Sequence, residues 1–163
     1  MKNRDSNNYN IDDNSKFITG VNVWFQKEIK VTKNRGCHII TNEILSVLPD
    51  LSKIKVGMLN LFIQHTSAGI TINESYDADV MKDLASSMDR IVPEDVLLYK
   101  HLDEGIDDAP SHIKCTLFGS SLSIPISNGE LSLGTWQGII LGEFRNEKKQ
   151  RKIIATINGI MQE

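Results

Sequence analysis

Apolar and polar side chains alternate along several stretches of the chain, as is typical of β-strands with one buried face. In the first stretch, residues 20–31, one parity carries the apolar side chains Val21, Val23, Phe25, Ile29 and Val31. Residues 56–64 are apolar on both parities, which predicts a central strand buried on both faces. A further short strand is predicted over residues 70–73.

Three other segments carry the signals of helices. Residues 41–48 predict a short helix that Pro49 ends. Apolar residues recur at helical spacing over 77–91, which predicts an amphipathic helix. A third helix is predicted to begin at Asp107 or Asp108, one of which would serve as its N-cap.

The C-terminal third of the chain has the pattern of consecutive strands. Segments 121–126 and 131–144 flank Asn128 and Gly129, a dipeptide that is a strong short signal of a β-hairpin. A last strand is predicted over 152–158. Because no βαβα alternation is present, the sequence predicts a mixed α+β fold with mainly antiparallel pairing and two main helices.

The two ends of the chain differ in composition. Residues 1–16 are rich in Asn, Asp and Ser and carry almost no apolar side chains. Such a segment buries too little surface to offset the entropy of ordering it, so we expect a flexible tail. The rest of the 163 residues, 17–163, is the size of one domain.

Composition also narrows the class of partner. Lys and Arg number 18 and Asp and Glu 21, and a formal net charge of −3 argues against a nucleic-acid partner. No apolar run approaches the ~18 residues of a membrane span, and the first residues lack a secretory signal, so no membrane partner is expected. Because Cys37 and Cys115 are the only cysteines, a disulfide framework is excluded and a cytoplasmic location is expected.

Three histidines are candidates for chemistry. His65 ends the buried strand 56–64 and opens a run of small residues, where it can face a pocket or simply form a strand-end hydrogen bond. His101 and His112 bracket an acidic stretch, and imidazoles with carboxylates can hold a divalent cation or perform acid–base chemistry. The alternative for this stretch is a solvated acidic loop followed by a helix cap. No zinc-finger or HExxH spacing is present.

Polar residues in two other regions are candidates for binding. Ser120 lies in a Gly-Ser-Ser run, where hydroxyls can contact phosphate oxygens. Trp136 offers a flat face to a heterocycle, although such a residue is more often part of a core. Four polar side chains share one parity of a single predicted strand, which a dry core cannot hold, and they indicate a cavity, solvent or a subunit contact: Thr135, Gln137, Glu143 and Arg145.

Glu74 directly follows the short strand over 70–73. It is either a general base that acts with His65 or an acidic residue that favours the start of the next helix. The residues alone leave both roles open.

Several of these motifs, taken together, resemble the YjbQ family. They are HTSAGITINE, HLDEGIDDAPSHIK and GTWQGI, which occur here in the family's order and within a resemblance that covers Gly20 to the C-terminus. The resemblance implies an α+β sandwich of mainly antiparallel strands that forms a homotrimer, with pockets between subunits. The sequence departs from the family pattern at Gly69, which would add backbone freedom, and at Leu102, which replaces a polar amide.

The family resemblance implies a secondary thiamine-phosphate synthase activity, in which a hydroxymethylpyrimidine diphosphate joins a thiazole phosphate and diphosphate leaves. The resemblance implies catalytic roles for the residues at the matching motif positions, which are His65, Glu74, His101, Asp107 and His112. A divalent cation, zinc or magnesium, is expected on His65, His101 and His112. Substrate contacts are expected from Ser120, Thr135, Trp136, Gln137, Glu143 and Arg145.

Two other functions fit the same residues. The first is metal-dependent hydrolysis of a small phosphate ester or amide, in which an activated water is the nucleophile. The second is a non-catalytic trimer that binds a metal or a small ligand. The residues by themselves do not separate these functions from the synthase.

Overall fold

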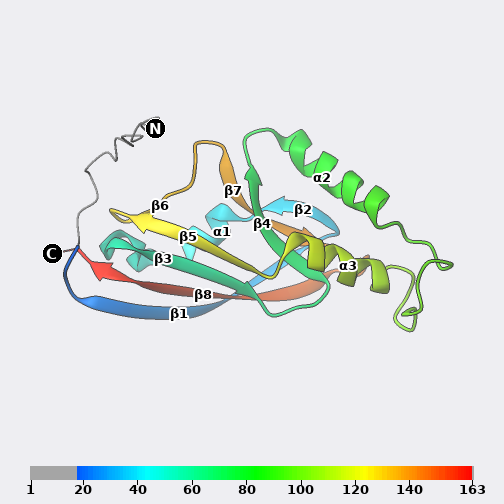
Figure 1. The fold of residues 1–163 in the computed structure, drawn as a ribbon, viewed down its shortest axis with the longest axis horizontal. Helices are drawn as coiled ribbons and strands as arrows, with labels where there is room; N and C mark the ends of the chain where they lie inside the picture. The colour runs from blue at the N-terminus through cyan, green and yellow to red at the C-terminus, as the bar shows by residue number, and fades with distance from the viewer. Residues whose placement is uncertain (1–17, 163) are drawn as a thin grey trace, which may run out of the picture.

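Two antiparallel β-sheets form the body of the molecule (Figure 1). The computed structural model describes residues 18–162, and the predicted tail over 1–16 lies outside them. The five-stranded sheet has the order β1-β8-β3-β5-β6 and the three-stranded sheet the order β2-β7-β4. The strands are β1 (Asn22–Lys33), β2 (Gly36–Ile39), β3 (Ile54–Ile63), β4 (Ala68–Glu74), β5 (Ser121–Ser127), β6 (Glu130–Leu131), β7 (Gln137–Glu143) and β8 (Lys149–Met161).

The main core fills the space between the two sheets. It takes the inward-facing side chains of both, such as Leu59 and Leu61 of β3 and Ile70 of β4. On the five-stranded sheet the opposite parity carries polar or partly exposed residues, as in β8, whose burial alternates from Arg151 to Gly159. The alternation in the sequence therefore indicates which face of the five-stranded sheet packs against the core.

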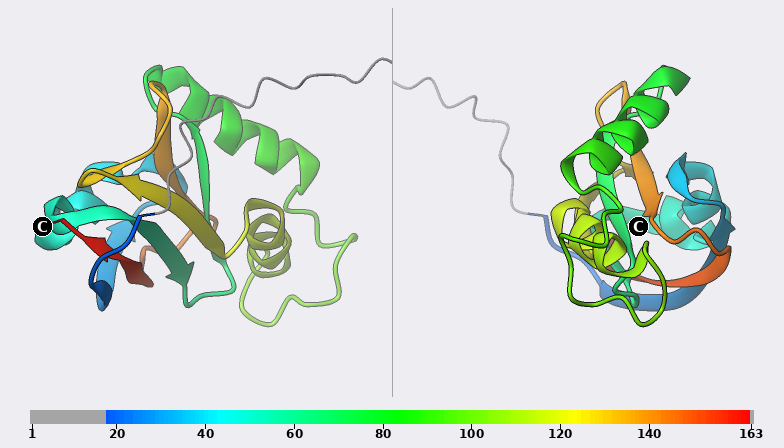
Figure 2. Two further views of the ribbon diagram at one scale, coloured as in Figure 1. Left: turned by 60° about the vertical axis from the view of Figure 1, so that its left-hand side comes forward. Right: turned by 90° about the vertical axis from the view of Figure 1, so that its right-hand side faces the viewer.

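Three α-helices complete the fold, in agreement with the predicted short helix and two main helices: the short α1 (Thr41–Ser46), and the longer α2 (Ala78–Ile91) and α3 (Asp108–Phe118), with a 3-10 helix over Pro49–Lys53. The helix α2 lies on the outer face of the three-stranded sheet (Figure 2), where Met81 packs with Cys37 and Ile140. Its start is fixed by Asp77, whose carboxylate accepts the backbone N–H of Asp79 at 2.9 Å. No helix over residues 18–162 is long and apolar enough to cross a membrane.

The hairpin at Asn128 and Gly129 is confirmed. Both residues have positive φ, 50° and 83°, as a tight two-residue hairpin turn requires. The strand expected over 131–144 is interrupted, however. Only its first residue, Leu131, pairs with β5 as part of β6, and the chain then crosses to the other sheet and pairs as β7. Residues 132–136 make this crossing, and the parity that is apolar at Leu133 is polar at Thr135.

Helix α3 lies against strand β4 at Gly69. A Cβ atom built on Gly69 would lie 2.7 Å from Cβ of Phe118 and 2.9 Å from the carbonyl oxygen of Gly119. Space, and not backbone freedom, is therefore the reason for glycine here, which corrects the expectation from the sequence. This approach is at the C-terminal end of α3, and earlier in the helix His112 and Cys115 contact the segment that follows β3, where the candidate site lies.

Candidate functional site

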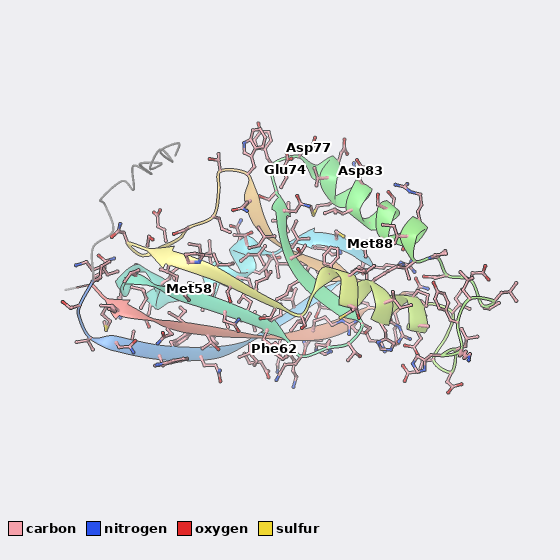
Figure 3. The ribbon with its side chains drawn as sticks, viewed as in Figure 1. Met58, Phe62, Glu74, Asp77, Asp83 and Met88 are labelled. Carbon is pink, nitrogen blue, oxygen red and sulfur yellow. The ribbon has the colours of Figure 1, made fainter. Side chains whose placement is uncertain are left out.

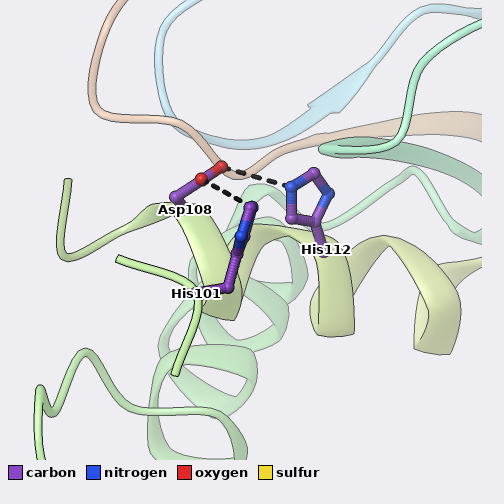
Figure 4. Close-up of side chains that lie close together, drawn as sticks. All are labelled: His101, Asp108 and His112. Carbon is purple, nitrogen blue, oxygen red and sulfur yellow. Dashed lines mark ion pairs between the residues drawn. The ribbon is translucent and has the colours of Figure 1, made fainter. Parts of the chain in front are cut away.

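His101 and His112 meet at the carboxylate of Asp108 (Figure 4). His101 Nε2 lies 2.9 Å from Asp108 Oδ2, and His112 Nε2 lies 3.2 Å from Asp108 Oδ1. One ligand atom from each residue lies within 4.8 Å of the other two. We call these three residues the histidine–aspartate cluster.

Local sequence places the three side chains. Asp108 and His112 are four residues apart at the start of α3, so they lie on one face of the helix. His101 comes from the irregular segment 92–107, which is held to the body by Glu104, whose backbone carbonyl accepts Arg145 Nη2 at 3.0 Å. Gly105, with φ of 119°, turns this segment back toward α3.

The carboxylate of Asp108 is buried, with only 1% of its side chain exposed. Its Oδ1 accepts Arg145 Nη1 at 2.6 Å. Its Oδ2 has no partner in hydrogen-bond geometry among residues 18–162, because His101 Nε2 approaches closely without the alignment of a hydrogen bond. A buried carboxylate oxygen without a hydrogen bond is costly, unless a cation or a proton lies beside it.

His112 is oriented by the backbone. Its Nδ1 lies 2.7 Å from the carbonyl oxygen of Thr66, which can only accept, so Nδ1 carries a proton. In the neutral ring, Nε2 then presents its lone pair to Asp108. Metal-binding histidines commonly have this arrangement, in which the second nitrogen donates to a carbonyl and fixes the tautomer.

The cluster has the composition and spacing of a three-ligand metal site. Ligand bonds of about 2.0–2.1 Å in tetrahedral geometry place ligand atoms roughly 3.3 Å apart, and each imidazole lies at a comparable distance from one of the two Asp108 oxygens. Two imidazoles with one carboxylate favour zinc or another transition metal over magnesium, which prefers oxygen ligands. The imidazole of His101 is 59% exposed, so an open position would face solvent.

Asp107, the expected catalytic aspartate, has a different role from Asp108. Its Oδ2 accepts Arg145 Nε at 3.0 Å and the backbone N–H of Asn146 at 2.8 Å. Asp107 is at the N-cap position of α3, but its side chain makes no cap hydrogen bond. Burial by itself would raise the pKa of Asp107, but the Asn146 N–H and the charge of Arg145 outweigh burial and lower this pKa.

Arg145, expected to bind substrate, is committed inside the protein. Besides Asp107 and Asp108, it contacts Glu104 Oε2 at 3.4 Å. Its guanidinium therefore holds the acidic segment against the turn between β7 and β8. This position makes Arg145 a support of the histidine–aspartate cluster.

His65 lies beside the cluster but outside it. It lines a cavity of about 390 Å³ together with His112 and Ser120, and the other lining residues are Thr66, Cys115, Thr116 and Gly119. Its Nε2 accepts the backbone N–H of Lys152 at 2.8 Å, so this nitrogen is not free to ligate a cation. Burial and the charge of Arg151 lower the pKa of His65.

A second group of expected site residues lies at the other end of the three-stranded sheet. Glu74 pairs with Gln137, whereas the cavity lies at the Ala68 end of β4. The six steps from Ala68 to Glu74 span about 20 Å at ~3.3 Å per residue. Figure 3 shows Glu74 near Asp77, at the start of α2. Thr135 and Trp136 precede β7 at this same end, and Trp136 is exposed.

Glu143 is fully buried and forms a two-point ion pair with Arg151. Both carboxylate oxygens lie 2.6 Å from nitrogens of this guanidinium. Arg151 also donates to the carbonyl oxygen of Ser67 at 3.4 Å. Glu143 was expected to contact substrate, but its carboxylate is instead paired with Arg151 inside the protein. This pair accounts for one of the polar side chains on that face of β7.

Sequence reasoning missed Asp108 as the residue that joins the two histidines. A signal was present, because Asp108 and His112 have the four-residue spacing of neighbours on one helix face. His101 could not be placed in this way. It reaches the cluster on a segment that Arg145, far away in the sequence, holds at the carbonyl oxygen of Glu104.

Comparison with known proteins agrees with the motifs. A family model described as UPF0047 protein YjbQ-like matches residues 26–160. This chain belongs to the YjbQ family. The UPF0047 protein YjbQ of Escherichia coli O157:H7 is 45% identical over 138 residues, which are 84% of this chain and 99% of the relative. The UPF0047 protein MJ1081 of Methanocaldococcus jannaschii is 36% identical over 84% of this chain and 96% of the relative.

Solved structures of the YjbQ family have the same fold. A YbjQ-like protein of Sulfolobus solfataricus P2 superposes with a TM-score of 0.75 at 26% identity, covering 85% of this chain and 99% of that protein. A YjbQ/UPF0047 family protein of Clostridium acetobutylicum has a TM-score of 0.65 at 35% identity, covering 79% and 97%. The α+β architecture with mostly antiparallel strands is therefore the family's own.

Proposed function

We propose that this protein is a metal-dependent hydrolase of small phosphate esters or amides. His101, Asp108 and His112 hold the cation, for which zinc is the better fit. The observation that carries the proposal is the buried Oδ2 of Asp108, which lacks a hydrogen-bond partner over residues 18–162 and faces the two imidazoles.

Some residues of the site would ligate the cation, and others hold these ligands in position. Asp108 and the two histidines supply three ligands and leave the solvent side open. Arg145 and the carbonyl oxygen of Thr66 hold Asp108 and His112 in the ligating orientation. A bound divalent cation supplies Lewis acidity to a phosphoryl oxygen and lowers the pKa of water toward 7.

Coupling of a pyrimidine diphosphate to a thiazole phosphate has less support within one chain. Departure of diphosphate needs cationic groups that face it, and the side chains of Arg145, Arg151 and Lys114 are committed to buried carboxylate pairs or to Asp89. Trp136, the expected stacking surface, lies at the other end of β4 and β7. The hydrolase does not require any of these groups to face its substrate.

Self-association could bring further groups of a second subunit to the cavity and so increase the support for the synthase. We propose the homotrimer that the family resemblance implies. In a trimer, the exposed Trp136 of one subunit can lie beside the cavity of the next. Sedimentation of the wild-type protein is expected to give the trimer mass, and Trp136→Ser to weaken it. A monomeric wild-type protein at micromolar concentration contradicts the trimer without affecting the metal site.

Metal binding and hydrolysis are tested separately. Zinc titration of the metal-free protein is expected to show one tight site, which H101A and H112A weaken by at least about 100-fold, more than the 10–100-fold typical of supporting residues. His38, half-buried outside the cluster, provides the control H38A. The zinc-loaded protein is then expected to release phosphate from a panel of esters without a second heterocycle. Unchanged zinc affinity in both cluster variants overturns the proposal.

A further inference from the structure

Two imidazoles line the same cavity, and their backbone contacts leave different nitrogens free. His112 donates through Nδ1 to the carbonyl oxygen of Thr66, so Nε2 is left for the cation. His65 uses Nε2 instead, at 2.8 Å from the backbone nitrogen of Lys152. The two rings are thus held in opposite tautomers.

The contact of His65 defines where its proton is. The backbone N–H of Lys152 can only donate, so His65 Nε2 must be the unprotonated acceptor. The neutral ring therefore carries its proton on Nδ1. Over residues 18–162, no protein group accepts a hydrogen bond from this Nδ1, and the half-buried ring borders the cavity.

We propose that His65 Nδ1–H is a hydrogen-bond donor to an oxyanion of the substrate, such as a phosphoryl oxygen, in the cavity beside the histidine–aspartate cluster. This inference rests on the proposed function and adds the group that contacts the substrate outside the metal ligands. His65 acts as a donor here, and not as a metal ligand or a general base. The backbone of β8, through Lys152, fixes the orientation.

The cavity favours an anion over a neutral ligand. No carboxylate is among its lining residues, which offer the hydroxyl of Ser120 and imidazole edges. The cationic side chains of Arg151 and Lys152 act on His65 from the β8 side, opposed by Glu143. A neutral donor that is already oriented stabilises an oxyanion without the cost of reorienting it.

The test uses inorganic phosphate and the protein loaded with cobalt(II) in place of zinc. Phosphate is expected to change the cobalt absorption spectrum and to bind the wild-type protein. H65M, which removes the donor, is expected to weaken phosphate by about 10-fold or more, as loss of a hydrogen bond to a charged group does. H65N, which restores an N–H near the position of Nδ1, is expected to recover part of this loss. H38M is the matched control.

A nitrogen-15 spectrum of the labelled metal-free protein gives an independent measurement. The protonated nitrogen of His65 is expected to be Nδ1, and a proton on Nε2 overturns the inference. Equal phosphate affinity in wild type and H65M, with cobalt bound in both, overturns the inference but leaves the metal site intact. Failure of the wild-type protein to bind cobalt overturns the proposed function itself.

Discussion

At the scale of single residues, the site depends on how one buried carboxylate is balanced. Arg145 forms an ion pair with Oδ1 of Asp108, and the imidazoles of His101 and His112 lie beside the same carboxylate. Removing a partner from a buried charge costs more than the pair itself contributes, because the remaining charge stays without compensation. Supporting residues should therefore affect the cation almost as strongly as the ligands.

Replacing Arg145 tests this dependence. R145M removes the guanidinium while keeping an unbranched side chain of intermediate length, and zinc affinity is expected to fall by about 10–100-fold. R145K keeps the charge but loses the fork that reaches Asp107 and Asp108 together, so an intermediate loss is expected. Isothermal titration with zinc measures both. Affinity within a factor of two of wild type in R145M would show that Arg145 does not orient Asp108.

The buried pair of Glu143 and Arg151 permits a second test at this scale. E143Q leaves Arg151 buried without a charge partner, so the free energy of unfolding should fall by about 3–5 kcal/mol. The double variant E143L/R151M replaces the pair with apolar side chains and should lose less than E143Q. Urea unfolding measures each value. A double variant less stable than E143Q contradicts this account of the pair.

At the scale of elements, the contact of α3 with β4 decides where the site forms. Gly69 allows this contact, since any Cβ there would meet Phe118 and the carbonyl oxygen of Gly119. A shift of the helix by a fraction of an ångström would move Asp108 and His112 relative to His101. A substitution at Gly69 is therefore expected to change the distances between Asp108, His112 and His101.

The variant G69A tests this coupling. Overpacking is expected to lower the free energy of unfolding by about 1–3 kcal/mol and to weaken zinc binding at the same time. G134A is the matched control, because its Cβ would meet only the flexible side chain of Gln137. Thermal unfolding with and without zinc measures both effects. If G69A is as stable as G134A, α3 is not tightly constrained at this position.

At the scale of the whole molecule, charge links distant segments and makes stability depend on pH. The folded pKa of Asp107 lies below its unfolded value, because the Asn146 N–H and Arg145 overcome the effect of burial. The unfolded carboxyl, with a pKa of about 3.9, therefore takes up its proton first as pH falls. The contribution of Asp107 is present above this unfolded pKa and is lost as pH falls through the lower folded pKa.

The variant D107N is expected to reveal this contribution. At pH 7 it should be less stable than wild type by about 1–3 kcal/mol, the cost of losing a charge-assisted hydrogen bond. The difference should shrink below about pH 4, where the Asp107 carboxyl of the unfolded wild-type chain takes up a proton before the folded one does. Urea unfolding at pH 7 and pH 3 measures it, and D103N, at an exposed carboxylate of the same segment, is the control. An equal difference at both pH values contradicts the linkage.

Much of the fold could be predicted from local patterns. The alternation over β1 and β8, the helical spacing of α2 and the turn at Asn128 and Gly129 each depend on nearby residues, so the sequence contains the necessary signals. The crossing between β6 and β7 was missed, although the apolar parity of Leu131 and Leu133 becomes polar at Thr135 and Gly134 lies between Leu133 and Thr135. These local signals mark an interruption of the strand, but they do not show that the chain continues in the other sheet.

The sequence by itself determined the family, the antiparallel α+β class and two of the three residues in the cluster. It did so because strand alternation, helix periodicity and motif order are local properties. Only the tertiary structure decided that Asp108 joins His101 and His112, that Arg145 and Glu143 are committed to buried ion pairs, and that Glu74 lies at the far end of β4. The physical reason is that buried charges are paired by side chains distant in sequence, and the packing of α3 on β4 fixes which partners meet.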